Sequence, residues 1–191
     1  MSGFARRVTA ALSASGVEAV AVDSFGTLTS DLPHGRWLES VVALRDDAGC
    51  TYFDWLCAVD EAPAGLRVLV HLLALPASPP GVDAVLVRTA VPAGSRLESL
   101  VPVFAGAAWH ERETTEMFGL EFVGGVGAHP LLLAEHFEGH PLRKDFTLAS
   151  RVVTGWPGAK DPATAATGGA RRTRRAGSST AVTPPRGGRS G

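Results

Sequence analysis

Three consecutive segments with strand character constrain the fold of this chain more than any other feature. Residues 50–59, 66–75 and 82–89 are rich in β-branched and aromatic residues or alternate apolar with polar side chains, and only short connections separate them. Strands that follow one another so closely usually pair antiparallel. The middle segment is apolar on both faces except for Arg67 and His71, which predicts a central strand covered on both sides. The sequence therefore predicts an antiparallel meander.

Helical patterns flank this meander. Apolar residues recur at helical spacing over 4–12 and 37–48, and a segment rich in Ala, Glu and Met over 105–118 is followed by Gly119, a typical helix cap. A β-branched run over 17–22 predicts one further strand. This order of elements predicts an α+β fold, in which a mostly antiparallel sheet packs against helices.

The charge changes sign along the chain, whose 191 residues carry a formal net charge of −1. Residues 1–156 hold 11 basic and 18 acidic side chains, whereas residues 157–191 hold seven basic and one acidic. The last stretch has too few apolar groups to offset the entropy of ordering. We therefore expect an α+β domain over 1–123, an extended arm over 124–157, and a disordered Arg/Gly/Pro-rich tail over 158–191.

The residue inventory argues against several classes of function. Cys50 and Cys57 are the only cysteines, too few for the four thiolates of an iron–sulfur cluster or a Cys₄ zinc site. No apolar run reaches the roughly 18 to 20 residues of a spanning helix, and the first residues lack the pattern of a secretory signal. We expect a soluble intracellular protein.

Motifs for catalysis and ligand binding are incomplete. A metalloprotease helix needs a second histidine four residues after the first, and after His110 that position holds Thr114. The glycine-rich stretch 124–127 lacks the Gly-Lys-Ser/Thr ending of a phosphate-binding loop. Three further histidines show no regular spacing for metal ligands: His129, His136 and His140. We expect no catalytic, cofactor-binding or metal site in this chain.

Two charged clusters stand out instead. On a helix, an aromatic, an arginine and two glutamates share one face at spacings i, i+3, i+4 and i+7; they are Trp109, Arg112, Glu113 and Glu116. Such a face suits either a polar interface anchored by the aromatic and the arginine, or a plain solvated surface. In the second cluster, over 139–146, Pro141 favours an extended or turned backbone that presents Arg143 and Lys144 outward together.

Together these clusters resemble a known family. Glu111-Arg112-Glu113-x-x-Glu116-Met117-Phe118-Gly119, followed by Glu138-Gly139-His140-Pro141-Leu142-Arg143-Lys144-Asp145-Phe146, is similar to the signature of the C subunit of the respiratory NADH:quinone oxidoreductase, complex I. The resemblance covers roughly residues 30–156 and is strongest over 97–146. One departure is that Gly124-Gly125-Val126 stands where the family usually has Gly-His-Pro, although the spacing to Glu138 is kept.

The resemblance implies a cofactor-free scaffolding subunit of the peripheral arm, on the cytoplasmic side of the bacterial cell membrane. Its partners would be the D-like, B-like and I-like subunits of that arm, with FMN and Fe–S clusters in partner subunits. Membrane association would be indirect, and the arm over 124–157 would bind partners. The implied partner-interface residues are Glu111, Arg112, Glu113, Glu116, Met117, Phe118, His140, Pro141, Arg143, Lys144 and Asp145.

Three alternatives remain open at this point. The chain could be the equivalent subunit of a related membrane-bound hydrogenase or of a dehydrogenase with another electron donor. It could also be a free-standing module that binds nucleic acid through its basic tail. The weakest alternative is a metal-dependent hydrolase that uses the three histidines of the arm.

Overall fold

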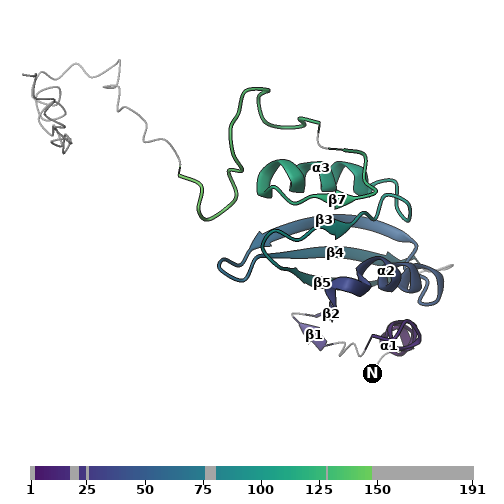
Figure 1. The fold of residues 1–191 in the computed structure, drawn as a ribbon. Helices are drawn as coiled ribbons and strands as arrows, with labels where there is room; N and C mark the ends of the chain where they lie inside the picture. Colours follow the sequence, from purple (N-terminus) through teal and green to yellow (C-terminus); the bar gives the residue numbers. More distant parts are fainter. Residues whose placement is uncertain (1–2, 18–21, 25, 76–80, 128, 148–191) are drawn as a thin grey trace, which may run out of the picture. The chain divides into compact units, whose positions relative to one another are not determined.

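The computed structural model describes residues 3–17, 22–24, 26–75, 81–127 and 129–147 (Figure 1). In chain order the elements are α1 (Gly3–Ala14), β1 (Val22–Ser24), β2 (Thr27–Leu32), the 3₁₀ turn η1 (His34–Arg36), α2 (Trp37–Asp46), β3 (Tyr52–Asp60), β4 (Leu66–Ala74), β5 (Asp83–Val91), β6 (Leu97–Glu98), α3 (Ala107–Phe118) and β7 (Phe122–Val123). The predicted α+β class is confirmed. The tail over 158–191 lies outside the described residues, so the predicted division into domain, arm and tail stays a prediction.

The meander, β3 to β5, forms one side of a five-stranded sheet of order β1-β2-β5-β4-β3, and β3 lies at its edge. The pairs β3–β4 and β4–β5 are antiparallel as predicted. Strand β2, which the sequence analysis did not identify, pairs parallel with β5 and makes the sheet mixed. Of the strand predicted over 17–22, only Val22 lies in β1, and residues 18–21 fall outside the described residues.

The two faces of the central strand β4 differ in burial. Val68, Val70 and Leu72 are fully buried and join side chains of α1 and α2 in the hydrophobic core. Leu69 and Leu73, on the opposite face, are only half-buried. The prediction that both faces of this strand are covered therefore holds fully for one face and only partly for the other.

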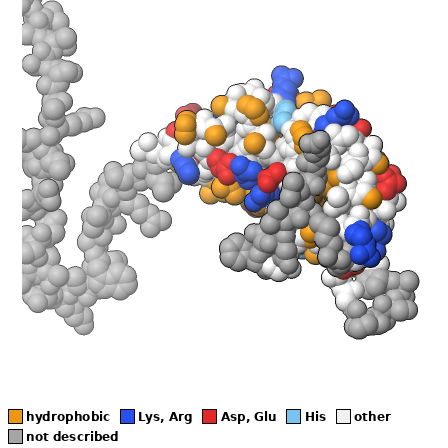
Figure 2. Space-filling model, turned by 90° about the horizontal axis from the view of Figure 1, so that it is seen from below, with side chains coloured by type: hydrophobic (Ala, Val, Ile, Leu, Met, Phe, Trp, Pro, Cys, Tyr) orange, Lys and Arg blue, Asp and Glu red, His pale blue; other side chains and the backbone are white. Residues whose placement is uncertain are grey.

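Charged side chains on that less covered face are joined across three strands. The Asp31 carboxylate of β2 accepts hydrogen bonds from Arg88 of β5 at 2.9 Å and from Arg67 of β4 at 3.1 Å. Arg67 also donates to Glu61 at 2.8 Å. On the face of the molecule seen in Figure 2, acidic and basic side chains are likewise interspersed among apolar ones.

Helix α3 lies along β3, the edge strand of the sheet (Figure 1). The Nδ1 atom of His110 lies 3.1 Å from the carbonyl oxygen of Leu56 and 3.4 Å from its backbone nitrogen. The ring of Phe53 packs against the rings of Phe104 and His110, with centroid distances of 5.8 and 5.3 Å. These contacts fix α3 to the sheet and leave its other side facing outward.

Replacing a buried side chain of β4 should destabilise the whole domain. Leu72→Ala removes apolar contacts and leaves a cavity in the core, so we expect the free energy of unfolding to fall by about 2–5 kcal/mol. Leu75→Ala, at a position that is 54% exposed just beyond the same strand, should change it by less than about 0.5 kcal/mol. Urea unfolding of the full chain measures both values, and equal losses would contradict this description of the core.

Candidate partner interface

The outward side of α3 carries the first charged cluster. The helix turns Ala107, Glu111, Thr114 and Phe118 toward the protein interior. Trp109 lies on the other side and is 64% exposed. The guanidinium group of Arg112 sits over its indole ring, 5.6 Å from the centroid, in a cation–π contact.

Arg112 and Glu116 bind the arm to α3. Arg112 donates hydrogen bonds to the carbonyl oxygens of His129, at 3.3 Å, and Pro130, at 2.9 Å. The Glu116 carboxylate accepts three consecutive backbone N–H groups, those of residues 131–133, at 2.8 to 3.0 Å. A charged helix face thus holds an arm segment that has neither helix nor strand among its described residues.

Electrostatics favours the ionised form of Glu116. Partial burial alone would raise the pKa of this carboxyl, but the three N–H donors and the positive charge of Arg112 outweigh that effect. The net result is a pKa below the ordinary value for glutamate. The ionised carboxylate is therefore the form that binds the arm.

The second charged cluster caps the C-terminus of α3. His140 Nδ1 lies 2.9 Å from the carbonyl oxygen of Glu116, and the N–H of Leu142 donates to the carbonyl of Met117 at 3.2 Å. Arg143 donates to the carbonyl of Phe118 at 3.3 Å. These carbonyl groups belong to the last turn of the helix, where the backbone has no internal partners and a cation is favoured.

Gly119 makes this close approach possible. It ends α3 in the left-handed region at φ 72°, where residues with side chains are strained. A Cβ atom at this position would also lie only 2.5 Å from Nε2 of His140. Glycine is therefore required both by the backbone and by the space that the imidazole occupies.

Asp60, which the sequence analysis did not single out, anchors the end of the arm. Its carboxylate accepts the backbone N–H of Lys144 and that of Ala62, each at 2.8 Å. These two bonds outweigh the effect of burial and hold the pKa of Asp60 below its ordinary range. The only signal in the sequence is a turn-forming aspartate before Pro63, which says nothing about a contact 84 residues away.

Glu111 differs from the other acidic residues of its helix because it points inward and is only 2% exposed. Its Oε2 accepts the hydroxyl of Ser99 at 2.7 Å, and its Oε1 accepts the N–H of Leu100 at 2.6 Å. Burial raises the pKa of Glu111, and the two hydrogen bonds offset only part of that shift. The residue ties the 99–101 turn to α3 from within.

The structure brings most of the predicted interface residues together within one chain. Arg112, Glu116, Met117, Phe118, His140 and Arg143 form the contact between helix and arm, and Lys144 joins it through its backbone. Asp145 accepts a hydrogen bond from Arg143 at 3.2 Å. Glu113 and Pro141 are not part of this contact, and Glu113 is exposed. Their contacts with a partner remain a prediction.

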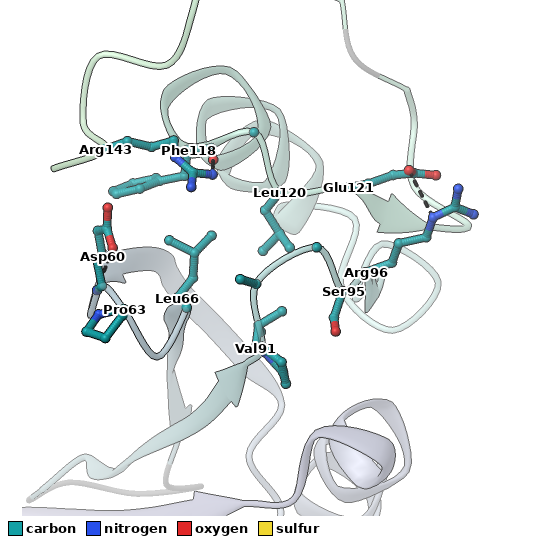
Figure 3. A pocket seen from close by; sticks show the side chains of 16 residues that line it. Asp60, Pro63, Leu66, Val91, Ser95, Arg96, Phe118, Leu120, Glu121 and Arg143 are labelled. Carbon is teal, nitrogen blue, oxygen red and sulfur yellow. Dashed lines mark hydrogen bonds and ion pairs between the residues drawn. The ribbon is translucent and has the colours of Figure 1, made fainter. Parts of the chain in front are cut away.

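A cleft of about 450 Å³ opens below the end of α3 (Figure 3). Leu66, Phe118 and Leu120 are part of its apolar lining. Asp60 and Arg143 border one end, and the other end holds the ion pair of Arg96 and Glu121 at 3.0 Å. Neither histidine nor cysteine lines the described cleft. Across the described residues, no cluster of three or more His, Cys, Asp or Glu side chains is arranged to hold a metal ion.

The fold and this contact define the chain as an α+β domain whose last helix is clamped by a returning arm. The family described as "Respiratory-chain NADH dehydrogenase, 30 Kd subunit" matches residues 31–152, and the chain belongs to this family. The resemblance found in the sequence is thereby confirmed. Within the described residues, no helix has both the length and the apolar character needed to cross a membrane.

Two relatives agree with this assignment. The chain is 37% identical over 126 residues to the C subunit of NADH-quinone oxidoreductase from Rhizobium johnstonii, a match covering 64% of this chain and 61% of the relative. It is 35% identical over 133 residues to the protein of that name from Mesorhizobium japonicum, covering 68% and 64%. The matched part spans less than two thirds of the length of each relative.

The fold also matches a chain in the structure of the membrane-bound sulfane sulfur reductase, an archaeal respiratory membrane complex. The TM-score is 0.64 at 19% sequence identity, with 74% of this chain and 84% of that chain covered. At this identity the match concerns the fold alone.

Low pH should weaken the hydrogen bonds between Glu116 and the arm, because it protonates the Glu116 carboxylate. Because the pKa of Glu116 is lowered in the folded state, its contribution is complete above the ordinary glutamate pKa of about 4.3 and is lost as the pH falls through the lowered value. We expect hydrogen-exchange protection of the 131–133 amides to decline below about pH 4. Glu116→Gln should reduce this protection about tenfold at neutral pH, because hydrogen bonds to charged groups exceed neutral ones. Glu39→Gln, at an exposed position on α2, is the matched control and should leave it unchanged.

Glu111 should show the opposite pH dependence. Because its pKa is raised in the folded state, the stability that it contributes is greatest in acid and falls as the pH rises past the ordinary glutamate value. Glu111→Gln keeps an acceptor for Leu100 without the buried charge, so it should be at least as stable as the wild type at pH 7. Glu111→Ala should lose about 2–4 kcal/mol, since it strands buried polar groups and leaves a cavity. Urea unfolding at pH 4 and pH 7 measures the stability of both variants. If Glu111→Gln were as unstable as Glu111→Ala at pH 7, the role assigned to the buried charge of Glu111 would be refuted.

Proposed function

We propose that this chain is the cofactor-free scaffolding C subunit in the peripheral arm of a proton-translocating NADH:quinone oxidoreductase. In this role it supports electron transfer from NADH through FMN and Fe–S centres of partner subunits to quinone, and the isolated chain is not catalytic. The complex would place it on the cytoplasmic side of the cell membrane. Family membership supports this role, and the clamped arm carries the structural argument.

The clamp supports a scaffolding role because it orders the arm before any partner binds. Arg112 and Glu116 hold the arm through its backbone, which leaves side chains free to face outward. Leu132 is 61% exposed, Leu142 is 56% exposed and Phe137 is 42% exposed. Apolar side chains held in place bind a partner at a lower entropic cost than those of a loose segment.

Trp109 provides an anchor next to this segment. An exposed tryptophan stacked with an arginine is a typical centre of a protein–protein contact. Arg143 and Lys144 add positive charge, which suits an acidic region of a neighbouring subunit. The proposed neighbours are the D-like, B-like and I-like subunits of the peripheral arm.

Purification of the full chain from its native membranes in a mild detergent tests this proposal. We expect the subunits of an NADH:quinone oxidoreductase among the co-purified proteins. Co-purification of hydrogenase subunits instead would favour the related complex with another electron donor. Recovery of the chain alone, in cells that contain the complex, would refute the scaffolding role.

Loss of the Arg112 side chain should weaken assembly more than it weakens the fold. Arg112→Ala removes two hydrogen bonds to the arm and the stacking on Trp109, so we expect at least a threefold drop in co-purified partners. The control is Arg36→Ala, which removes an exposed pair with Glu39 on α2. Urea unfolding of the isolated variants should differ by less than about 1 kcal/mol. Loss of stability comparable to that of a core substitution would contradict the interface role.

A further inference from the structure

A second cleft, of about 300 Å³, opens beside α3 where the chain leaves β7. Its lining includes Gly125, Val126 and Gly127, of which the two glycines contribute no side chain. The volume far exceeds the 10–15 Å³ that one water needs, so the cleft can receive the end of a long side chain. The other described lining residues are Glu111, Arg112, Thr115, Glu121 and Phe122.

The buried carboxylate of Glu111 borders this cleft. A Cβ atom built on Gly125 would lie 3.2 Å from Oε2 of Glu111, so this oxygen faces the space in front of the glycine. Its two hydrogen-bond partners, Ser99 and the N–H of Leu100, are neutral. Each carboxylate oxygen can accept a further hydrogen bond beyond the one that it has.

Glu111 has no positive partner within the described part of the chain. It takes part in none of the ion pairs there. Arg112 is next in sequence and also lines the cleft, but its guanidinium group donates to the carbonyl oxygens of His129 and Pro130. A buried charge that is hydrogen-bonded but not neutralised is costly, and a cation placed beside it recovers part of that cost.

We propose that this cleft receives the guanidinium group of an arginine from a protein partner, with Glu111 as its buried counter-ion. A guanidinium group fits better than an ammonium group because it is planar, weakly hydrated and able to donate two parallel hydrogen bonds to one carboxylate. Gly125 and Gly127, which contribute no side chain to the lining, leave room for the guanidinium group to approach Glu111. The inference rests on the proposed function in one respect, that the arginine belongs to a neighbouring subunit.

The first experiment measures the binding of a guanidinium compound to the cleft in the absence of any partner protein. Methylguanidinium is titrated into the isotopically labelled full chain at pH 7.5 and constant ionic strength, and the amide signals of Gly125 and Gly127 are followed by NMR. We expect saturable shifts in the wild type and an apparent Kd at least tenfold higher in Glu111→Gln. Gly125→Ala, whose new methyl group crowds Oε2, should weaken binding to a similar degree.

Two variants serve as matched controls. Glu39→Gln removes an exposed carboxylate on α2 that is paired with Arg36 and does not line the cleft. Gly35→Ala adds a methyl group where no atom lies within 4 Å. Both should change the Kd less than twofold. Equal binding by wild type and Glu111→Gln, or an equal loss in Glu39→Gln, would overturn the proposal.

The second experiment measures assembly in the same variants. We expect Gly125→Ala and Glu111→Gln to reduce the co-purified partner subunits at least threefold relative to Gly35→Ala. Unchanged assembly despite lost methylguanidinium binding would overturn the partner assignment. Failure of the wild-type chain to co-purify with any subunit would overturn the proposed function, whereas the NMR result would still stand for the cleft itself.

Discussion

The position of the arm depends on the hydrogen bonds that the carboxylate of Glu116 accepts. This carboxylate gathers three consecutive backbone N–H groups that have no strand or helix to pair with, and Arg112 holds the residues just before them. The arm then follows the helix toward its end, where His140 and Arg143 meet carbonyl groups of the last turn. The two charged clusters are therefore two halves of one contact, which explains why they occur together.

Two glutamates of α3, five residues apart, have opposite electrostatic roles. Glu116 faces outward, where hydrogen bonds and a neighbouring arginine favour its ionised form. Glu111 faces inward, where burial disfavours the charge, and the two groups that donate to it among the described residues, Ser99 and Leu100, are neutral. Local environment rather than residue type therefore moves the pKa values of these two glutamates in opposite directions.

Local patterns in the sequence were sufficient to predict the meander, the three helices and the helix cap at Gly119. Strand β2 was missed because its residues are mostly polar and its partner β5 lies far along the chain, with Leu28 opposite Val85. Helical periodicity placed Trp109 outward correctly. The same periodicity puts Glu111 on the buried face with Ala107. The sequence analysis missed this because it grouped Glu111 with the other charged residues of the family motif. The role of Asp60 could not be found because its contact with the arm, at Lys144, is long-range.

The imidazole of His110 covers part of the edge of the sheet. An uncovered edge strand can recruit the strand of another molecule, which leads to aggregation. The imidazole from α3 lies against the backbone N–H and C=O of Leu56 in the middle of β3, where Nδ1 hydrogen-bonds one of the two, and so obstructs pairing with a further strand. This contact therefore disfavours edge-to-edge pairing of β3 with the same strand of a second copy.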